Sequence, residues 1–345
     1  MEESTRLNKK LYFLYNITMN LPTKIRIESS SNCQLKCPSC PTATGAIRQA
    51  IKPQHLSYDN FVKLLNNNTH IKDVELSNYG EIFLNPQLYW IMRYAHSQGV
   101  RLHADNGVNF NFVDEDVMYG LVGFEFNSMT ISIDGVTEAT YSKYRVGGNL
   151  KKVLKNIEHL NSIKKKSSID YPKLTWQFIV FGHNEHELAT AREMAKELNM
   201  DFYAKLSWDE GFSPVQDTKL VQIQINAPYA SRKEYEETTG ENYCRGICQQ
   251  LWNAPVINSD GTMLGCCRNF WGDFGPNVFD VGLEASLSNA KMDYAKMMLL
   301  GLHPARNDIP CTTCDIYLDL VKSGKYLTPE EIERENRTLK EKLNG

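Results

Sequence analysis

Between residues 24 and 207 the chain alternates short β-rich runs with helical stretches, and this alternation restricts its fold more than any other feature. The strand candidates are Lys24–Glu28, Asp73–Asn78, Arg101–Asp105, Ser128–Asp134, Lys173–Phe181 and Asp201–Ser207. Helices are expected between them, near Ser57–Asn67, Asn85–Gln98, Val113–Val122, Thr137–Lys164 and Asn184–Leu198. Six strands alternating with helices predict an α/β fold with a parallel sheet and right-handed crossovers. In such a sheet the chemistry gathers at the carboxyl ends of the strands.

Three cysteines, Cys33, Cys37 and Cys40, follow the first predicted strand in a C-x3-C-x2-C spacing. Thiolates are the usual ligands of iron–sulfur clusters, and three of them in one short loop can wrap one face of a cubane cluster. A fourth local ligand is missing, so one iron would stay open to an exogenous molecule. The alternatives are three buried thiols or a structural zinc site. Zinc would need a fourth Cys or His, and the nearest downstream histidine is His55.

The composition is that of a globular protein, with 42% hydrophobic and 23% charged residues in a chain of 345 that can hold two domains. A net charge of −3 argues against a nucleic-acid partner. The longest apolar run near the start, residues 11–15, is too short for a signal peptide, and no stretch approaches membrane-spanning length. Nine cysteines without a secretory signal indicate a reducing compartment. We therefore expect a cytoplasmic protein with no membrane partner.

A second cysteine-rich segment begins at Cys244. Residues 256–263 within it predict a hairpin with an Asp260-Gly261 turn. A hairpin with a cysteine on either side, together with a distant C-x2-C, can enclose a cluster with four thiolates, and a closed zinc site is the alternative. The four cysteines in these positions are Cys248, Cys266, Cys311 and Cys314. Cys244 and Cys267 are left over.

The motifs that follow the successive strands resemble those of the radical S-adenosylmethionine (SAM) superfamily, whose signature is C-x3-C-x2-C after the first strand. The position before the last cysteine, often aromatic in that family, is Ser39 here. The resemblance covers about residues 24–207 and implies an open, partial (β/α)6 TIM barrel. Its other motifs are Asn78-Tyr79-Gly80-Glu81, Asp105-Asn106-Gly107, Ile131-Ser132-Ile133-Asp134-Gly135, Tyr141-x3-Arg145 and Val180-Phe181-Gly182-His183-Asn184.

The resemblance implies that Cys33, Cys37 and Cys40 hold a [4Fe-4S] cluster whose open iron binds SAM. It places the Glu81 carboxylate at the amino group of SAM, and Ser132 and Arg145 near its ribose and carboxylate. Three further residues are expected in the cofactor site on the same ground: Gly80, Asn106 and Asn184. Each position also has an alternative role: Glu81 as a helix cap, Ser132 as a buried strand residue and Arg145 as a surface ion-pair partner.

The second cysteine group resembles the SPASM/twitch extension of the same superfamily, in its shorter twitch version because no cysteine follows Cys314. This implies a small C-terminal domain, a β-hairpin plus helices, with an auxiliary [4Fe-4S] cluster held by Cys248, Cys266, Cys311 and Cys314. The predicted divisions are an N-terminal extension (1–23), the partial barrel (24–215), a linker (216–243), the twitch domain (244–320) and a helical tail (321–345) that Thr328 and Glu331 cap.

The resemblance implies an enzyme that cleaves SAM reductively to a 5′-deoxyadenosyl radical and abstracts a hydrogen atom from a substrate, which we expect to be small and polar, such as a sugar or cyclitol. With the auxiliary cluster as electron acceptor the outcome is alcohol oxidation, and the enzyme is a dehydrogenase-like oxidoreductase. Its electron donor is expected to be a flavodoxin or ferredoxin. The candidate catalytic or substrate-contacting residues are Tyr79, Cys267, Arg268 and Trp271.

Three other outcomes stay open from the sequence. Return of a hydrogen atom by Cys267 or Cys244 would make the enzyme an epimerase. A third kind of enzyme modifies a peptide, although the roughly 23 residues before the first strand are too few for a peptide-recognition domain. Outside catalysis, the cysteines would serve a zinc or iron–sulfur scaffold that binds a partner.

Overall fold

The computed structural model describes residues 21–334. These residues form two compact units, a larger one of residues 27–63 and 72–243 and a smaller one of residues 21–26, 64–71 and 244–334. Most of the predicted N-terminal extension and residues 335–345 of the predicted tail lie outside the described residues. Within residues 21–334, no helix combines the length and apolar character needed to span a bilayer.

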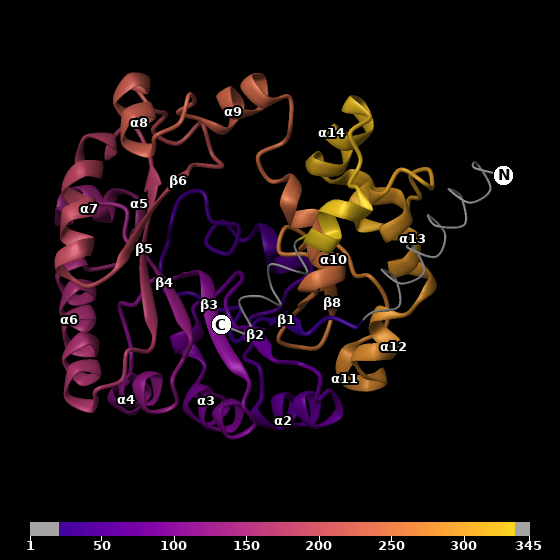
Figure 1. Cartoon of the computed structure of the whole chain (residues 1–345), viewed down its shortest axis with the longest axis horizontal. Helices are drawn as coiled ribbons and strands as arrows, with labels where there is room; N and C mark the ends of the chain where they lie inside the picture. The colour runs from indigo at the N-terminus through magenta and orange to yellow at the C-terminus, as the bar shows by residue number, and fades with distance from the viewer. Residues whose placement is uncertain (1–20, 335–345) are drawn as a thin grey trace. The chain divides into compact units, whose positions relative to one another are not determined.

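The larger unit contains a sheet whose strand order follows the chain (Figure 1). Starting from its edge at β6, the eight-stranded sheet has the order β6-β5-β4-β3-β2-β1 over its first six strands, and every neighbouring pair from β2 to β6 is parallel. This is the arrangement expected when helical crossovers connect successive strands. The strands are β1 (Lys24–Ile27, which crosses the boundary between the units), β2 (Asp73–Glu75), β3 (Arg101–Val108), β4 (Ser128–Ser132), β5 (Lys173–Val180) and β6 (Asp201–Leu206).

Helices cover one face of this sheet (Figure 1). Side chains on that face are buried under the helices, whereas those on the other face include polar ones. Arg192 of α7 lies over the ring of Phe202 in β6, 4.8 Å from its centroid, and Trp176 is the register partner of Phe202. Because side chains alternate along a strand, Gln177 and Tyr203 face away from the helices. The helices are α2 (Tyr58–Asn67), α3 (Leu88–Ser97), α4 (Glu115–Gly123), α5 (Glu138–Tyr144), α6 (Leu150–Ser167), α7 (Leu188–Glu197), α8 (Thr218–Ile225) and α9 (Arg232–Thr239), with 3-10 turns η1 (Ala46–Gln49), η2 (Ile82–Leu84) and η3 (Glu185–Glu187).

Two stretches of the larger unit differ from the sequence prediction. The helix expected over 137–164 is divided into α5 and α6, because Gly147 adopts a φ of 87° and Asn149 caps α6 by accepting a hydrogen bond from Lys152 N. Residues 216–243, expected as a linker, contain α8 and α9. Each of these helices has only eight residues and starts at a side-chain cap, Asp217 or Ser231. Helices this short show too few turns for a clear apolar periodicity.

The smaller unit combines a hairpin with short helices. Strands β7 (Val256–Ile257) and β8 (Met263–Gly265) pair antiparallel, and Gly261 adopts a φ of 88°, which confirms the predicted Asp260-Gly261 turn. The predicted capping box is confirmed too, since Thr328 N donates to Glu331 Oε2 (2.7 Å) and Glu331 N to Thr328 Oγ1 (3.3 Å). The helices are η4 (Arg245–Gln249), α10 (Gln250–Asn253), α11 (Val278–Val281), α12 (Leu283–Leu287), α13 (Ala290–Leu299), η5 (Pro310–Thr313) and α14 (Asp315–Ser323).

Gly80, which follows β2, lies against the segment that follows β1. A Cβ atom at this position would stand 1.8 Å from the carbonyl oxygen of Ser30 and 2.7 Å from that of Asn32. Both are backbone atoms, so neither can swing aside. We expect Gly80→Ala to lower the free energy of unfolding of the apoprotein by at least about 1–3 kcal/mol, measured by urea denaturation. Gly123→Ala, where a Cβ would meet nothing within 4 Å, is the matched control and should cost nothing. Equal stability of the two variants would contradict this close approach.

Candidate functional site

The C-x3-C-x2-C cysteines lie in the loop between β1 and η1, in the larger unit. They pack at the carboxyl end of β5 and the end of α5, where a site was predicted. Burial, together with the charges of Glu81, Cys37 and Cys40, raises the pKa of the Cys33 thiol to about 12. The apolar cluster around the loop consists of Leu35, Cys37, Tyr144, Ile179 and Phe181, with Cys33, Cys40 and Phe212 packed against it.

The cysteine loop is tied to the segments that follow β6 and β2. Ser39 Oγ donates to Asp209 Oδ2 (2.5 Å), and Trp208 Nε1 donates to Ser39 O (3.3 Å). Thr42 Oγ1 donates to Tyr79 O (2.6 Å). These contacts hold the loop at the ends of strands that are far apart in the sequence.

Two side chains donate hydrogen bonds to the thiol sulfurs of this loop. Arg145 Nη1 lies 3.9 Å from Cys37 Sγ, and Asn109 Nδ2 lies 3.8 Å from Cys33 Sγ. Arg145 also forms an ion pair with Asp134 (Nε to Oδ2, 2.5 Å), whose side chain has no exposed surface. Arg145 is therefore a buried ion-pair partner rather than the surface one considered from the sequence.

Glu81 follows Gly80 and its carboxylate is buried beside the cysteine loop. Its side chain accepts hydrogen bonds from Asn109 N (2.6 Å) and Phe83 N (3.4 Å). Glu81 therefore caps η2, which was one of its two roles considered from the sequence. Burial raises its pKa to about 7. A cationic group placed beside this carboxylate would be stabilised, and would in turn lower the pKa of the carboxyl.

The remaining residues predicted to bind the cofactor hold the strand ends together. Asn106 Nδ2 donates to Asn78 O (2.9 Å), and the buried Ser132 Oγ accepts from Gln177 Nε2 (3.1 Å). Asn184 is fully buried, and its amide accepts from Phe181 N and donates to the carbonyl oxygens of Asp134 and Ile179. Direct contact of Asn106, Ser132 and Asn184 with a cofactor stays a prediction.

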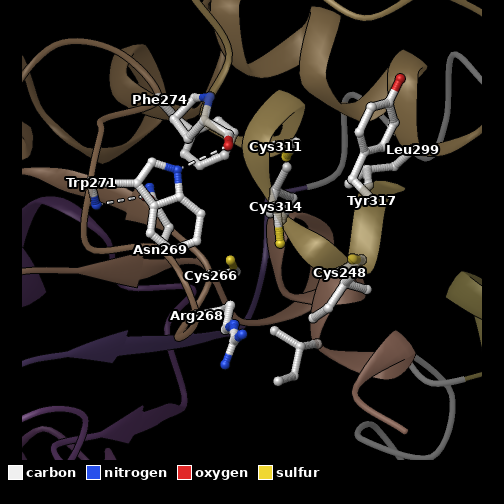
Figure 2. Close-up of a pocket in the computed structure, with 14 residues that line it drawn as sticks. Cys248, Cys266, Arg268, Asn269, Trp271, Phe274, Leu299, Cys311, Cys314 and Tyr317 are labelled. Carbon is white, nitrogen blue, oxygen red and sulfur yellow. Dashed lines mark hydrogen bonds between the residues drawn. The ribbon is translucent and has the colours of Figure 1, made fainter. Parts of the chain in front are cut away.

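The second group of cysteines lines one pocket of the smaller unit (Figure 2). The pocket contains about 360 Å³ of atom-free space, part of it open to solvent, and its walls include the apolar Leu251, Phe274 and Leu299. Burial, together with the charges of neighbouring cysteines, raises the pKa of Cys266 to about 12 and that of Cys248 well above its ordinary value. The four cysteines brought together are Cys248, Cys266, Cys311 and Cys314.

Both groups fit a metal cluster chemically, because buried thiols lose their protons readily only when a bound cation compensates the charge. The three cysteines of the first group share one apolar cluster, and the four of the second line one pocket. Among residues 21–334, no three His, Cys, Asp or Glu side chains converge closely enough to hold a single metal ion.

The candidate catalytic residues lie in different units. Tyr79 belongs to the larger unit, where its backbone N donates to Glu28 Oε2 (2.6 Å). In the smaller unit, Arg268 lines the cysteine pocket and pairs with Asp315 (2.7 Å). Trp271 lines the same pocket and donates from Nε1 to Pro310 O (3.0 Å). Cys267 is partly exposed, and its backbone N donates to Gln250 Oε1 (2.7 Å). Their catalytic roles stay predictions.

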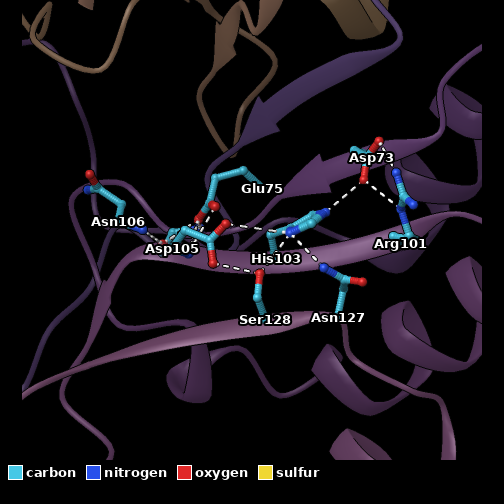
Figure 3. Close-up of polar contacts among 9 residues, drawn as sticks. Asp73, Glu75, Arg101, His103, Asp105, Asn106, Asn127 and Ser128 are labelled. Atoms are coloured by element: carbon cyan, nitrogen blue, oxygen red, sulfur yellow. Dashed lines mark hydrogen bonds and ion pairs between the residues drawn. The ribbon is translucent and has the colours of Figure 1, made fainter. Parts of the chain in front are cut away.

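A polar network extends over the helix-free face of the sheet from β2 to β4 (Figure 3). His103 Nε2 lies 2.7 Å from Asp73 Oδ1, and His103 Nδ1 lies 2.8 Å from Ser128 Oγ. The Ser128 hydroxyl donates to Asp105 Oδ1 (2.7 Å), which extends the network toward the end of β3. Arg101 completes the network with two hydrogen bonds to Asp73.

Sequence reasoning missed Asn109, Trp208 and Asp209. Asn109 stands two residues past Gly107, and Trp208 and Asp209 directly follow β6. Their position after a strand could have identified them, because polar and aromatic residues that follow the strands of a parallel sheet lie at the edge where sites form.

The fold was compared with those of known proteins. No family model matches the chain, and no curated protein matches it. Among solved structures, Streptococcus suis SuiB bound to S-adenosylmethionine matches with a TM-score of 0.62 and 12% identity over 94% of this chain and 80% of SuiB. SuiB bound to the precursor peptide SuiA matches with a TM-score of 0.61 and 13% identity over 94% and 78%. BtrN in complex with AdoMet and 2-DOIA has a TM-score of 0.45 and 14% identity over 81% and 87%.

The likeness to SuiB shows the fold. The chain has the α/β partial-barrel fold predicted from the sequence, and it shares this fold with SuiB. The SPASM/twitch assignment of the smaller unit stays a prediction.

The ion pair of Asp73 gives the fold a pH dependence. Burial acts to raise the pKa of Asp73, but hydrogen bonds and charge from His103 and Arg101 outweigh it and hold this pKa below the ordinary value. A depressed carboxyl pKa stabilises the folded state above the ordinary pKa of about 4, and this contribution is lost as the pH falls through the folded value. We expect Asp73→Asn to lower the melting temperature of the apoprotein at pH 7, and this deficit to shrink in scanning calorimetry as the pH falls below about 4. Asp116→Asn, at an exposed position of α4, is the control, and a deficit for Asp73→Asn that does not vary with pH would refute the argument.

Proposed function

We propose that the chain is a radical SAM enzyme, in which Cys33, Cys37 and Cys40 hold a [4Fe-4S] cluster that binds SAM. The observation that carries the proposal is the cysteine loop: three converging thiols, two of them hydrogen-bonded by side chains, at the strand ends of a fold shared with SAM-bound SuiB. When bound and reduced, the cluster and SAM supply a 5′-deoxyadenosyl radical that abstracts a hydrogen atom from a substrate C–H bond.

The chain's own residues bind and orient these groups. Glu81 supplies a buried negative charge for the amino group of SAM, and Gly80 allows the backbone to approach the cysteine loop closely. Tyr144, Phe181 and Phe212 pack around the loop with ring centroids 4.5–5.5 Å apart and exclude water from it. In this proposal Asn106, Ser132 and Asn184 complete the SAM site.

The second cysteine group is proposed to hold an auxiliary [4Fe-4S] cluster of the twitch type. Four thiols around one pocket can close the coordination of every iron, which favours electron transfer over substrate binding at that cluster. Such a cluster would accept the electron that a hydroxyl-bearing substrate radical gives up as it loses a proton, and the overall reaction would be the two-electron oxidation of an alcohol. We also propose that a low-potential protein such as flavodoxin or ferredoxin donates the electrons, and that the enzyme is cytoplasmic.

A small polar substrate, sugar- or cyclitol-like, is supported by the sheet face below the cysteine loop. Lys205 is the register partner of Ile179, which packs against the loop, and its Nζ donates to Gln177 Oε1 (3.2 Å). Tyr203 and Trp208 are 47% and 38% exposed in the same part of the larger unit. Amide and ammonium groups beside partly exposed aromatic rings suit a hydroxylated ring. Tyr79, Cys267 and Arg268 are the proposed catalytic or substrate contacts.

Peptide modification is the second candidate, because a solved structure of SuiB, which shares this fold, holds a precursor peptide. Epimerisation is the other radical outcome, with Cys267 or Cys244 as the hydrogen donor, and both thiols are partly exposed.

The enzyme proposal predicts about eight irons per chain if both clusters are cubane, and release of 5′-deoxyadenosine when SAM and dithionite are added anaerobically. Replacing Cys33, Cys37 and Cys40 by Ala should abolish this release and leave about half of the iron. A wild-type protein that binds zinc alone or forms no 5′-deoxyadenosine would instead support a non-enzymatic scaffold. Complete loss of iron in the triple variant would show that the second group holds no cluster of its own.

Oxidation and epimerisation differ in whether the reacting carbon carries a hydrogen atom in the product. A screen of sugars, cyclitols and short peptides for accelerated SAM consumption would identify a substrate. In deuterated water, oxidation should leave no solvent deuterium at the reacting carbon, because the product is a ketone. Deuterium retained at that carbon, detected by mass spectrometry, would instead support epimerisation, and replacement of Cys267 by Ala should then abolish the incorporation.

A further inference from the structure

The thiols of Cys37 and Cys33 each receive an N–H group from a different part of the larger unit. Arg145, at the C-terminal end of α5, directs Nη1 to Cys37 Sγ at 3.9 Å. Asn109, in the segment after β3, directs Nδ2 to Cys33 Sγ at 3.8 Å. The backbone of each residue is fixed by its own element, so the two donors approach the loop independently.

Both donors are held in place by further contacts. Asp134 accepts from Arg145 Nε through Oδ2 and from Ile179 N through Oδ1 (2.7 Å), and the Arg145 guanidinium carbon lies 5.3 Å from the Tyr144 ring centroid. Asn109 Oδ1 accepts from Gln34 Nε2 (2.9 Å) and Asn111 N (3.1 Å). The backbone N–H group of Asn111 can only donate a hydrogen bond, so the side-chain oxygen of Asn109 must face it. The Asn109 side-chain NH2 group therefore faces Cys33.

We propose that Arg145 and Asn109 set the reduction potential of the cluster on Cys33, Cys37 and Cys40. This inference rests on the proposed function, because it requires a cluster on these cysteines. Reduction adds one electron to the cluster, so N–H donors and a cation at its sulfur ligands stabilise the reduced state more than the oxidised one. Hydrogen bonds to the sulfurs and the local charge are among the factors that tune such clusters.

The surroundings of the loop strengthen this effect. The Arg145 side chain is only 12% exposed, and Ile179, Tyr144 and Phe181 next to Cys37 are at most 1% exposed. In such an apolar region electrostatic interactions are less screened than in water. The Asp134 carboxylate offsets part of the Arg145 charge, but Arg145 Nη1 is the group that contacts the sulfur. Both donors therefore make the cluster easier to reduce.

The test is an EPR-monitored potentiometric titration of the anaerobically reconstituted full-length protein, with dithionite supplying one electron per cluster. The signal that changes on addition of SAM identifies the N-terminal cluster. Asn109→Asp keeps the oxygen that faces Asn111 and replaces the N–H donor by a carboxylate oxygen. The double variant Asp134→Asn/Arg145→Gln removes both charges together, so that no buried carboxylate is left unpaired. We expect both variants to shift the midpoint potential to more negative values, by more than the error of the titration.

Two further variants separate tuning from folding. Arg145→Lys keeps the cation and should restore part of the shift seen in the double variant. Arg192→Gln, on the helix-covered face of the sheet, removes an arginine far in the structure from the sulfurs and should leave the potential unchanged. Potentials equal to wild type in Asn109→Asp and in the double variant, with iron retained, would overturn this inference alone. Loss of iron in both variants would assign the two residues to folding and overturn it as well, whereas a wild-type protein without any cluster would overturn the proposed function.

Discussion

The Asp134 carboxylate organises the site in the larger unit. It follows β4, accepts a hydrogen bond from the backbone of β5 at Ile179, and pairs with Arg145 at the end of α5, which in turn reaches Cys37. One buried side chain thus links two strands, a helix and the cysteine loop. Removing only one partner of such a pair would leave an uncompensated buried charge, at a cost of about 3–5 kcal/mol. The position of Cys37 therefore depends on an ion pair that lies outside the cysteine motif.

The two groups of thiols are built differently. In the larger unit the cysteines sit close together in sequence, and aromatic rings and N–H donors from other elements surround them. In the smaller unit the four cysteines come from η4, the end of β8 and the η5 region, and an apolar pocket surrounds them. A loop with three close cysteines suits a cluster that keeps one iron open, whereas thiols gathered from several elements suit a closed one.

The sequence was enough to predict the strands and the convergence of the cysteines, because both depend on local patterns. All six strand candidates begin at the residue where the strand begins, and their alternating side chains define the two faces of the sheet. The residues that position the loop could not be predicted in the same way. Asn109 meets Cys33 across 76 residues of chain, and Asp209 meets Ser39 across 170. Contacts over such separations leave no periodicity or spacing in a single sequence, and the short helices α8 and α9 were missed because eight residues hold little periodic signal.

The bond between Ser39 and Asp209 also bears on how the protein matures. A ribosome that has made the cysteine motif must still add the whole sheet, through β6, before Asp209 exists to anchor the loop. Closing a contact this distant is entropically costly and comes late in folding. The growing chain therefore carries an unanchored motif, and only the finished barrel presents the three sulfurs in their final arrangement.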